Sequence, residues 1–163
     1  MNMIDIFSKD TTTYNAWTYE YEKCYYGDFT GSAILDIGGD MGSSAVWFVQ
    51  RGAKKVIVFE KDEKYYPLWE ELRHAIGEIA DKIEYRKEEA TTDKIKDIEY
   101  DVLKVDCEGC EMDIINEDIL KSKKWMIAVH TFVNGWEKLE EKLIKYGGKK
   151  VFDNGGERMY RNI

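Results

Sequence analysis

The chain of 163 residues is long enough to fold as one domain with a sizeable core, and its apolar fraction of 44% with five tryptophans is typical of a folded globule. Its net charge of −8 argues against a nucleic-acid partner, because phosphate binding requires a basic surface. No apolar run approaches the length of a membrane span, and the start lacks the apolar segment of a signal peptide, so we expect a cytoplasmic protein with no membrane contact. The three cysteines fit a reducing compartment rather than a disulfide framework.

Apolar patterning predicts helices and strands that alternate along the chain. After an aromatic-rich start, a helix is expected from about Thr13 to Tyr25. The expected strands are 33–37, 55–59, 82–86, 101–105, 125–131, 149–152 and 158–161. The expected helices between them are 43–51, 62–76, 92–98, 113–120 and 136–146, with Pro67 in the first turn of its helix. This alternation predicts an α/β fold: a Rossmann-like, doubly wound sheet of about seven strands, most of them parallel.

The last two strands are expected to break the parallel pattern. Only residues 153–157 separate them, which is too few for a crossover, so they should form an antiparallel hairpin. We expect one domain over 1–163, with an N-terminal aromatic helical segment at 1–30 and the Rossmann-like core at 31–163. The aromatic segment is expected to cover the core rather than to act as a substrate lid.

A glycine-rich turn follows the first strand, in the stretch Asp36-Ile37-Gly38-Gly39-Asp40-Met41-Gly42-Ser43, and Glu60 ends the second strand. This arrangement suits a cofactor that contains adenosine, since a carboxylate such as Glu60 can hold both ribose hydroxyls. A P-loop is excluded because no lysine ends the turn. A nicotinamide or flavin site needs glycine at the third and sixth positions from Gly38, where the chain has Asp40 and Ser43. A carboxylate at the third position would repel a pyrophosphate.

S-adenosylmethionine (SAM) fits the acidic turn better. It has no phosphate and its sulfonium is cationic, so a pocket rich in carboxylates suits it. Four acidic residues are expected to point from the carboxyl edge of the sheet into one crevice, at the switch point between the first and fourth strands: Asp36, Asp40, Glu60 and Asp106.

Two motifs carry a family resemblance. Residues 36–42 resemble the D-x-G-x-x-x-G motif of class I SAM-dependent methyltransferases. Residues 101–111, DVLKVDCEGCE, resemble the more specific D-x-x-K-x-D-x-E-G-x-E signature of FkbM-type methyltransferases, and residues 58–62 match that family's acidic segment, with Lys61 where proline is commoner. The resemblance spans residues 34–130. It implies a SAM-dependent methyltransferase of the EC 2.1.1 class that methylates an oxygen atom of a small-molecule or sugar-like acceptor.

The resemblance also implies roles for individual residues. The three loop glycines let the methionine part of SAM lie against the loop, Asp36 orders the loop and meets the amino group directly or through water, and Glu60 holds the ribose. Lys61 is expected beside the adenine face, and Glu89-Ala90 at the adenine amino group, with Glu88 an equal candidate. The expected cofactor contacts are Asp36, Gly38, Gly39, Asp40, Gly42, Glu60, Lys61, Glu89, Ala90 and Asp106.

Two residues are candidates for catalysis. Asp106 and His130, at the ends of the fourth and fifth strands, are best placed to align a nucleophile and remove its proton. For His130, a general base and a buried histidine bonded to the backbone are equal alternatives. Phe132 and Trp136 are expected walls of the acceptor pocket. Because the chain is short, either the acceptor is small or a homodimer completes its pocket.

Other patterns have plainer interpretations. Cys107 and Cys110 are expected to be packing residues rather than a redox pair or half of a zinc site. Glu108 and Glu111 are expected to order their loop and cap the next helix rather than bind a metal with Asp106, so no metal is predicted. Two rival functions remain: a SAM-binding regulator without turnover and, against the glycine count, a nicotinamide-dependent oxidoreductase.

Overall fold

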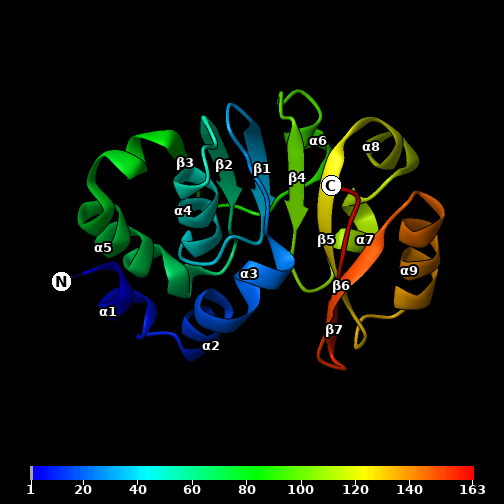
Figure 1. The fold of residues 1–163 in the computed structure, drawn as a ribbon, viewed down its shortest axis with the longest axis horizontal. Coiled ribbons are helices and arrows are strands. Elements are labelled where there is room, and N and C mark those ends of the chain that lie inside the picture. The colour runs from blue at the N-terminus through cyan, green and yellow to red at the C-terminus, as the bar shows by residue number, and fades with distance from the viewer. Residues whose placement is uncertain (1) are drawn as a thin grey trace.

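The protein is built around one seven-stranded sheet in the order β3-β2-β1-β4-β5-β7-β6, and the computed structural model describes residues 2–163 (Figure 1). The first five strands are parallel, and β7 runs antiparallel to both β5 and β6. This confirms the predicted α/β sheet with its C-terminal hairpin. The strands are β1 Ala33–Ile37, β2 Lys55–Phe59, β3 Ile83–Arg86, β4 Val102–Val105, β5 Lys124–His130, β6 Lys149–Asp153 and β7 Glu157–Arg161.

Helices cover both faces of the sheet (Figure 1). The first half of the chain contributes α1 Met3–Phe7, α2 Thr11–Asn15, the π-helix η1 Ala16–Glu20, α3 Tyr21–Cys24, α4 Ser43–Gln50, the 3₁₀ helix η2 Glu63–Tyr65, α5 Tyr66–Ile76 and the 3₁₀ helix η3 Gly77–Lys82. The second half contributes α6 Thr92–Ile95, α7 Glu111–Ile114, α8 Glu117–Ser122 and α9 Trp136–Lys145. None of the helices within residues 2–163 is long and apolar enough to cross a membrane.

Two apolar cores lie on opposite sides of the sheet because successive strand residues point to opposite faces. In β1, Ile34 packs in the core that contains Phe48 of α4, whereas Leu35 packs in the core that contains Trp125 of β5 and Leu143 of α9. Parallel strands with both faces covered are apolar along their whole length, which is why β1 and β2 could be predicted to the residue.

The helices differ more from the prediction than the strands do. The helix expected from Thr13 to Tyr25 is present as α2, η1 and α3 in succession, while α1 and η3 were not predicted. The helix expected over 113–120 is two helices, because Ile115 is extended and the Asn116 side chain accepts a hydrogen bond from the Ile119 N–H at 3.0 Å, which starts α8 anew. Pro67 lies in the first turn of α5, as predicted.

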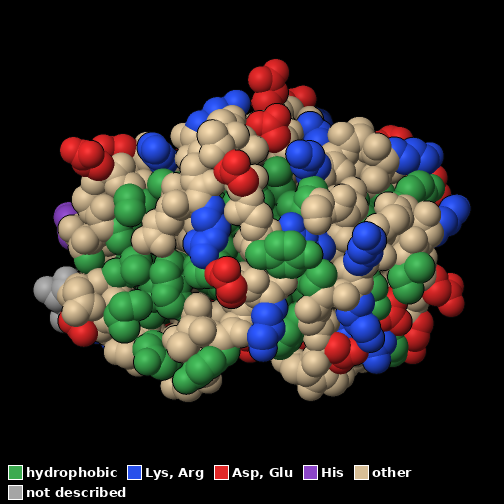
Figure 2. All heavy atoms as spheres, viewed as in Figure 1, with side chains coloured by type: hydrophobic (Ala, Val, Ile, Leu, Met, Phe, Trp, Pro, Cys, Tyr) green, Lys and Arg blue, Asp and Glu red, His purple; other side chains and the backbone are tan. Residues whose placement is uncertain are grey.

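The aromatic start of the chain packs on the core, as predicted for Tyr21, Tyr25 and Phe29, which are all buried. Tyr19 and Tyr26 of the same segment remain exposed. On the face shown in Figure 2, acidic and basic side chains are interspersed rather than gathered by sign.

Gly148, just after α9, provides a test of the packing on the second face. A Cβ atom at this position would lie 2.6 Å from Cη2 of Trp125 and 2.7 Å from the Leu143 carbonyl oxygen. Gly148→Ala should therefore lower the free energy of unfolding by about 1–3 kcal/mol, measured by urea denaturation. Gly156→Ala is the control, because a Cβ there meets only the Asn154 side chain at 3.8 Å. Equal stability of the two variants would contradict the packing described.

Candidate functional site

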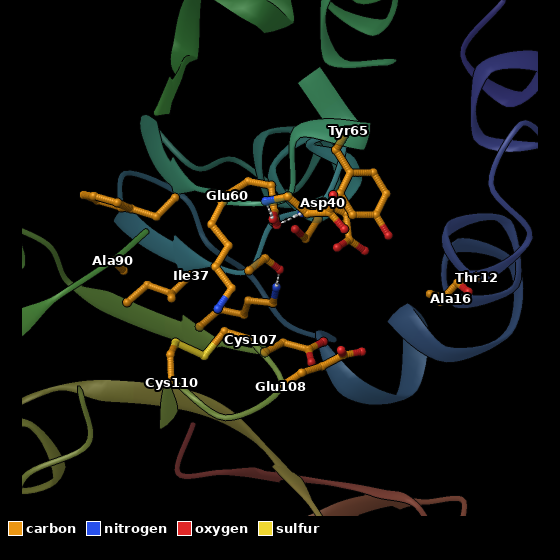
Figure 3. A pocket seen from close by; sticks show the side chains of 18 of the residues that line it. Thr12, Ala16, Ile37, Asp40, Glu60, Tyr65, Ala90, Cys107, Glu108 and Cys110 are labelled. Atoms are coloured by element: carbon orange, nitrogen blue, oxygen red, sulfur yellow. Dashed lines mark hydrogen bonds between the residues drawn. A yellow bond between two sulfur atoms is a disulfide. The ribbon is translucent and has the colours of Figure 1, made fainter. Parts of the chain in front are cut away.

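A pocket of about 230 Å³ opens at the carboxyl ends of β1, β2 and β4 (Figure 3). It lies where the strand order reverses between β1 and β4, the place where open α/β sheets bind ligands. The loops after β1, β2, β3 and β4 line it, together with His130 of β5 and Glu157 of β7. The N-terminal helical segment closes one side through Ala16 and Tyr25. The predicted crevice is therefore present. One of its walls is the N-terminal aromatic segment, which was expected only to cover the core.

A buried ion pair lies beneath the pocket. Asp36 is fully buried, its Oδ2 accepts a hydrogen bond from Ser44 Oγ at 2.5 Å, and its Oδ1 lies 3.0 Å from Lys104 Nζ. Lys104 also donates to the Gly38 carbonyl. Burial works against the Lys104 charge, but Asp36, Asp106 and Asp40 outweigh it and raise its pKa to about 12. Asp36 thus orders the loop, as predicted, but it does not line the pocket, because Lys104 and Ser44 occupy its carboxylate.

The loop glycines are required by the protein's own packing. Gly38 has a φ of +73°, and a Cβ on it would lie 1.8 Å from the Asp106 carbonyl oxygen. A Cβ on Gly39 would lie 2.4 Å from Val58 Cγ1. Gly38 and Gly39 line the pocket, but Gly42 does not: it packs against Trp69, where a Cβ would come within 2.9 Å. The structure thus places Gly42 outside the pocket lining, and its expected contact with the cofactor stays a prediction.

Glu60 is held in one orientation at the end of β2. Its Oε2 accepts a hydrogen bond from the Asp40 N–H at 3.0 Å, and its Oε1 accepts one from the Asp62 N–H at 2.7 Å. Burial raises the pKa of this carboxyl, while the two N–H groups oppose the shift. Each oxygen keeps further acceptor capacity toward the pocket, so the pair can accept from two neighbouring hydroxyls (Figure 3).

Asp40 lines the pocket beside Glu60 (Figure 3). Its φ of +49° is unusual for a residue other than glycine, and Tyr85 donates a hydrogen bond to its carbonyl. Burial raises the pKa of the Asp40 carboxyl to about 8; Lys104 opposes the shift, and Asp106 and Glu60 add to it. Carboxylates that raise one another's pKa in this way are stabilised in their ionised forms by a cationic ligand.

The residues expected at the adenine all line the pocket. Ala90 is buried, whereas Lys61 and Glu89 form an exposed ion pair at 3.1 Å. Glu88 also lines the pocket and pairs with Lys94 at 2.8 Å. Because Glu88 and Glu89 both reach the pocket, both remain candidates for the adenine contact.

His130 lies between two carboxylates. Its Nδ1 is 3.0 Å from Glu111 Oε1, and its Nε2 is 3.4 Å from Asp106 Oδ1. Burial disfavours the imidazolium, but hydrogen bonds to Asp106 and Glu111 outweigh it and raise the pKa of His130 to about 10. An imidazole that is protonated at neutral pH has no free lone pair, which argues against His130 as a general base. The alternative, a histidine bonded to the backbone, is also not what the structure shows, because both ring nitrogens face carboxylates.

Asp106 is also a weak candidate for a base. Although burial opposes its ionisation, His130 and Lys104 lower the pKa of its carboxyl, and the Tyr25 hydroxyl lies 3.4 Å from Oδ2. The expected acceptor walls Phe132 and Trp136 do not line the pocket. Phe132 is 69% exposed beside His130, and Trp136 stacks with Arg158.

Among the residues that line the pocket, Glu20, Tyr25, Lys104 and Glu157 were given no role in the site by the sequence analysis, and the contact of Glu111 with His130 was not predicted either. Lys104 could have been recognised from the sequence, because a lysine inside the apolar strand β4 implies a buried partner. The expectation that Glu111 orders its loop is confirmed, because its Oε2 accepts a hydrogen bond from the Gly109 N–H at 2.6 Å.

Cys107 and Cys110 form a disulfide at the pocket wall, which corrects the expectation of reduced packing residues (Figure 3). The left-handed φ of +53° at Glu108 folds the intervening turn so that the two Cα atoms lie 5.6 Å apart, within the range that a disulfide requires. Cys24 is a free, buried thiol, and burial raises its pKa to about 12.

Several solved structures with the same fold are methyltransferases. TrmK from M. capricolum, in complex with S-adenosylhomocysteine (SAH), has a TM-score of 0.65 at 15% identity, over 88% of this chain and 66% of that one. The C-terminal domain of precorrin-6Y C5,15-methyltransferase from Rhodobacter capsulatus has a TM-score of 0.61 at 11% identity, over 93% and 88%. Magnesium protoporphyrin IX methyltransferase from Synechocystis PCC 6803, with bound SAM, has a TM-score of 0.55 at 11% identity, over 83% and 71%. The chain has the class I SAM-dependent methyltransferase fold.

Two viral proteins are similar in sequence. Protein 158B of Sulfolobus islandicus rod-shaped virus 1 is 36% identical over 147 residues, which cover 88% of this chain and 87% of that protein. Protein 65 of Sulfolobus islandicus filamentous virus (isolate Iceland/Hveragerdi) is 33% identical over 162 residues, which cover 96% and 95%. The chain belongs to the family of these uncharacterized viral proteins. No protein-family model matches the chain.

Lys104→Met tests the buried ion pair. The variant leaves the Asp36 carboxylate buried without its partner, so the free energy of unfolding should fall by about 3–5 kcal/mol, measured by urea denaturation. The control is Lys121→Met, which removes an exposed pair with Glu117 and should leave the unfolding midpoint unchanged. A Lys104→Met midpoint equal to that of the control would contradict the structural role of the pair.

Thiol titration tests the disulfide. In denaturant without reductant, the protein should react with one equivalent of a thiol reagent, at Cys24, and after reduction with three. The Cys24→Ser variant should show none before reduction and two after it. Three reactive thiols in unreduced, anaerobically handled protein would refute the disulfide.

Proposed function

We propose that the protein is a SAM-dependent methyltransferase of the EC 2.1.1 class. The observation that carries the proposal is the Glu60 carboxylate, fixed by the N–H groups of Asp40 and Asp62 and facing the pocket at the switch point of the sheet. A carboxylate in that place accepts hydrogen bonds from both hydroxyls of a ribose. Two proteins of the same fold hold SAH and SAM in their solved structures, which supports SAM as the cofactor.

The charge of the pocket supports SAM over a dinucleotide. Asp40 and Asp106 line the pocket together with Glu60, and Lys104 beneath them is already paired with Asp36. Carboxylates in these positions attract the sulfonium and the amino group of SAM and repel a pyrophosphate. In this proposal the backbone of Gly38 and Gly39 contacts the methionine part of SAM. The adenine is contacted by Lys61, Ala90 and one of Glu88 and Glu89.

For the acceptor, we propose a hydroxyl group of a small or sugar-like molecule. The resemblance of residues 101–111 to the FkbM signature supports oxygen as the methylated atom. The fold does not select the acceptor, because neighbours named for precorrin and magnesium protoporphyrin share it with a neighbour named as a putative tRNA methyltransferase. The net charge of −8 supports a partner other than nucleic acid. We also propose that a second copy of the chain, in a homodimer, completes the pocket that holds the acceptor.

Glu60→Ala tests the cofactor site. Because two charge-assisted hydrogen bonds of about 1.5–3 kcal/mol each are lost, the dissociation constant for SAH should rise by a factor of about 100 or more in calorimetric titration. The matched control is Glu63→Ala, whose carboxylate is exposed and lies outside the pocket, and it should bind SAH as the unaltered protein does.

The same titration separates the rival functions. Binding of NADH but not of SAH would overturn the methyltransferase proposal in favour of an oxidoreductase. Binding of SAM and SAH without transfer to any acceptor would instead favour a SAM-binding regulator.

A further inference from the structure

The pocket is lined by a glutamate that neither motif includes. Glu157 is the first residue of β7 and lies directly opposite His130 of β5 in the antiparallel register. The carboxylates of Glu157 and Asp106 and a ring nitrogen of His130 offer atoms that all lie within 4.8 Å of one another. Glu157 is half-buried and lines the pocket, and its carboxylate accepts no hydrogen bond from residues 2–163.

The backbone holds Glu157 firmly. Its N–H donates to Asn154 Oδ1 at 2.8 Å, and the neighbouring Gly156 carbonyl accepts a hydrogen bond from the Thr131 N–H at 2.9 Å. The first bond orders the hairpin turn, and the second ties the turn to Thr131, which directly follows β5. A carboxylate on a rigid turn can meet a substrate in a defined geometry, which a mobile loop cannot provide.

The surroundings of Glu157 make it the more basic of the two carboxylates in the cluster of Asp106, His130 and Glu157. Burial, and then repulsion by Asp106, raise its pKa to about 7; His130 and Lys104 oppose the shift, and Glu20 adds to it. The remaining titratable group from a packed element is Cys24 of α3, whose thiol stays protonated. Asp106 and Glu111 both pair with His130, whereas Glu157 has no ion-pair partner of its own among residues 2–163. Its ionised form at neutral pH can therefore accept a proton without breaking an ion pair.

Resting on the proposed methyltransferase function, we propose that Glu157 is the general base that deprotonates the acceptor hydroxyl. As the acceptor O–H proton moves to the Glu157 carboxylate, an oxygen lone pair forms the new O–C bond to the methyl group of SAM. The C–S bond breaks with its electron pair left on sulfur, which yields SAH and a neutral methyl ether. His130, held by Asp106 and Glu111, is a positioning residue in this scheme.

The test compares Glu157→Gln with Glu141→Gln, an exposed glutamate of α9 outside the pocket. With tritiated SAM and a panel of methyl glucoside, glycerol and catechol, kcat/KM of Glu157→Gln should fall by about 10²–10⁴-fold, while SAH affinity stays within about twofold. The unaltered protein should gain activity as pH rises through about 7, and Glu157→Gln should lack this rise. Glu141→Gln should match the unaltered protein in both measurements.

A second measurement does not depend on the acceptor. In protein with ¹³C-labelled glutamate side chains and bound SAH, the carboxyl resonance that disappears in Glu157→Gln should titrate with a midpoint near 7. A midpoint below about 5, close to that of an ordinary glutamate, would overturn the proposal even if no acceptor of the panel is methylated.

The outcomes separate this proposal from the one on which it rests. Failure of the unaltered protein to bind SAH would refute the methyltransferase function itself. Normal SAH binding together with full turnover by Glu157→Gln would refute only the role of Glu157. Turnover that requires added Mg²⁺ and stops with a chelator would also refute it, because the carboxylate would then serve as a metal ligand beside Asp106 and His130.

Discussion

The pocket depends on one buried ion pair, between Asp36 and Lys104. The parallel register of β1 and β4 pairs these two residues directly, so neither charge can leave the sheet without unpairing the other. The pair fixes the turn that follows β1, because Asp36 accepts from Ser44 at the start of α4 and Lys104 donates to the Gly38 carbonyl. A buried pair of this kind adds little net stability, but it specifies one conformation of the turn.

Within that frame, the surroundings of each acidic side chain determine its chemistry. Glu60 is fixed by two N–H groups and serves recognition, whereas Asp106 is committed to His130. Burial and the neighbouring negative charge of Asp106 both raise the pKa of Glu157, which makes it the better proton acceptor. Groups of one chemical type thus take different roles because their environments move their pKa values apart.

The two motifs contributed unequally to what could be predicted. The position of Glu60 at the end of β2 follows from strand length alone, and the crevice follows from the βαβ order of the chain. The motif over 101–111 placed Asp106 on the pocket, but it could not show that its cysteines join or that Glu111 turns toward His130. Those contacts depend on the backbone of the turn at Glu108 and Gly109, where φ is positive. The residue pattern of the motif does not predict this backbone conformation at Glu108.

The sequence by itself determined the alternation of elements, the reversal of strand order and the final hairpin, because these depend on local periodicity and on the length of the connections. Only the tertiary structure decided which side chains meet in the pocket. Glu157 and His130 are far apart in the chain and meet because β7 pairs with β5 in one register, and a shift of one residue would turn Glu157 to the other face of the sheet. Asp36 pairs with Lys104 instead of lining the pocket, because the partner of a buried charge is set by the fold and not by the local sequence.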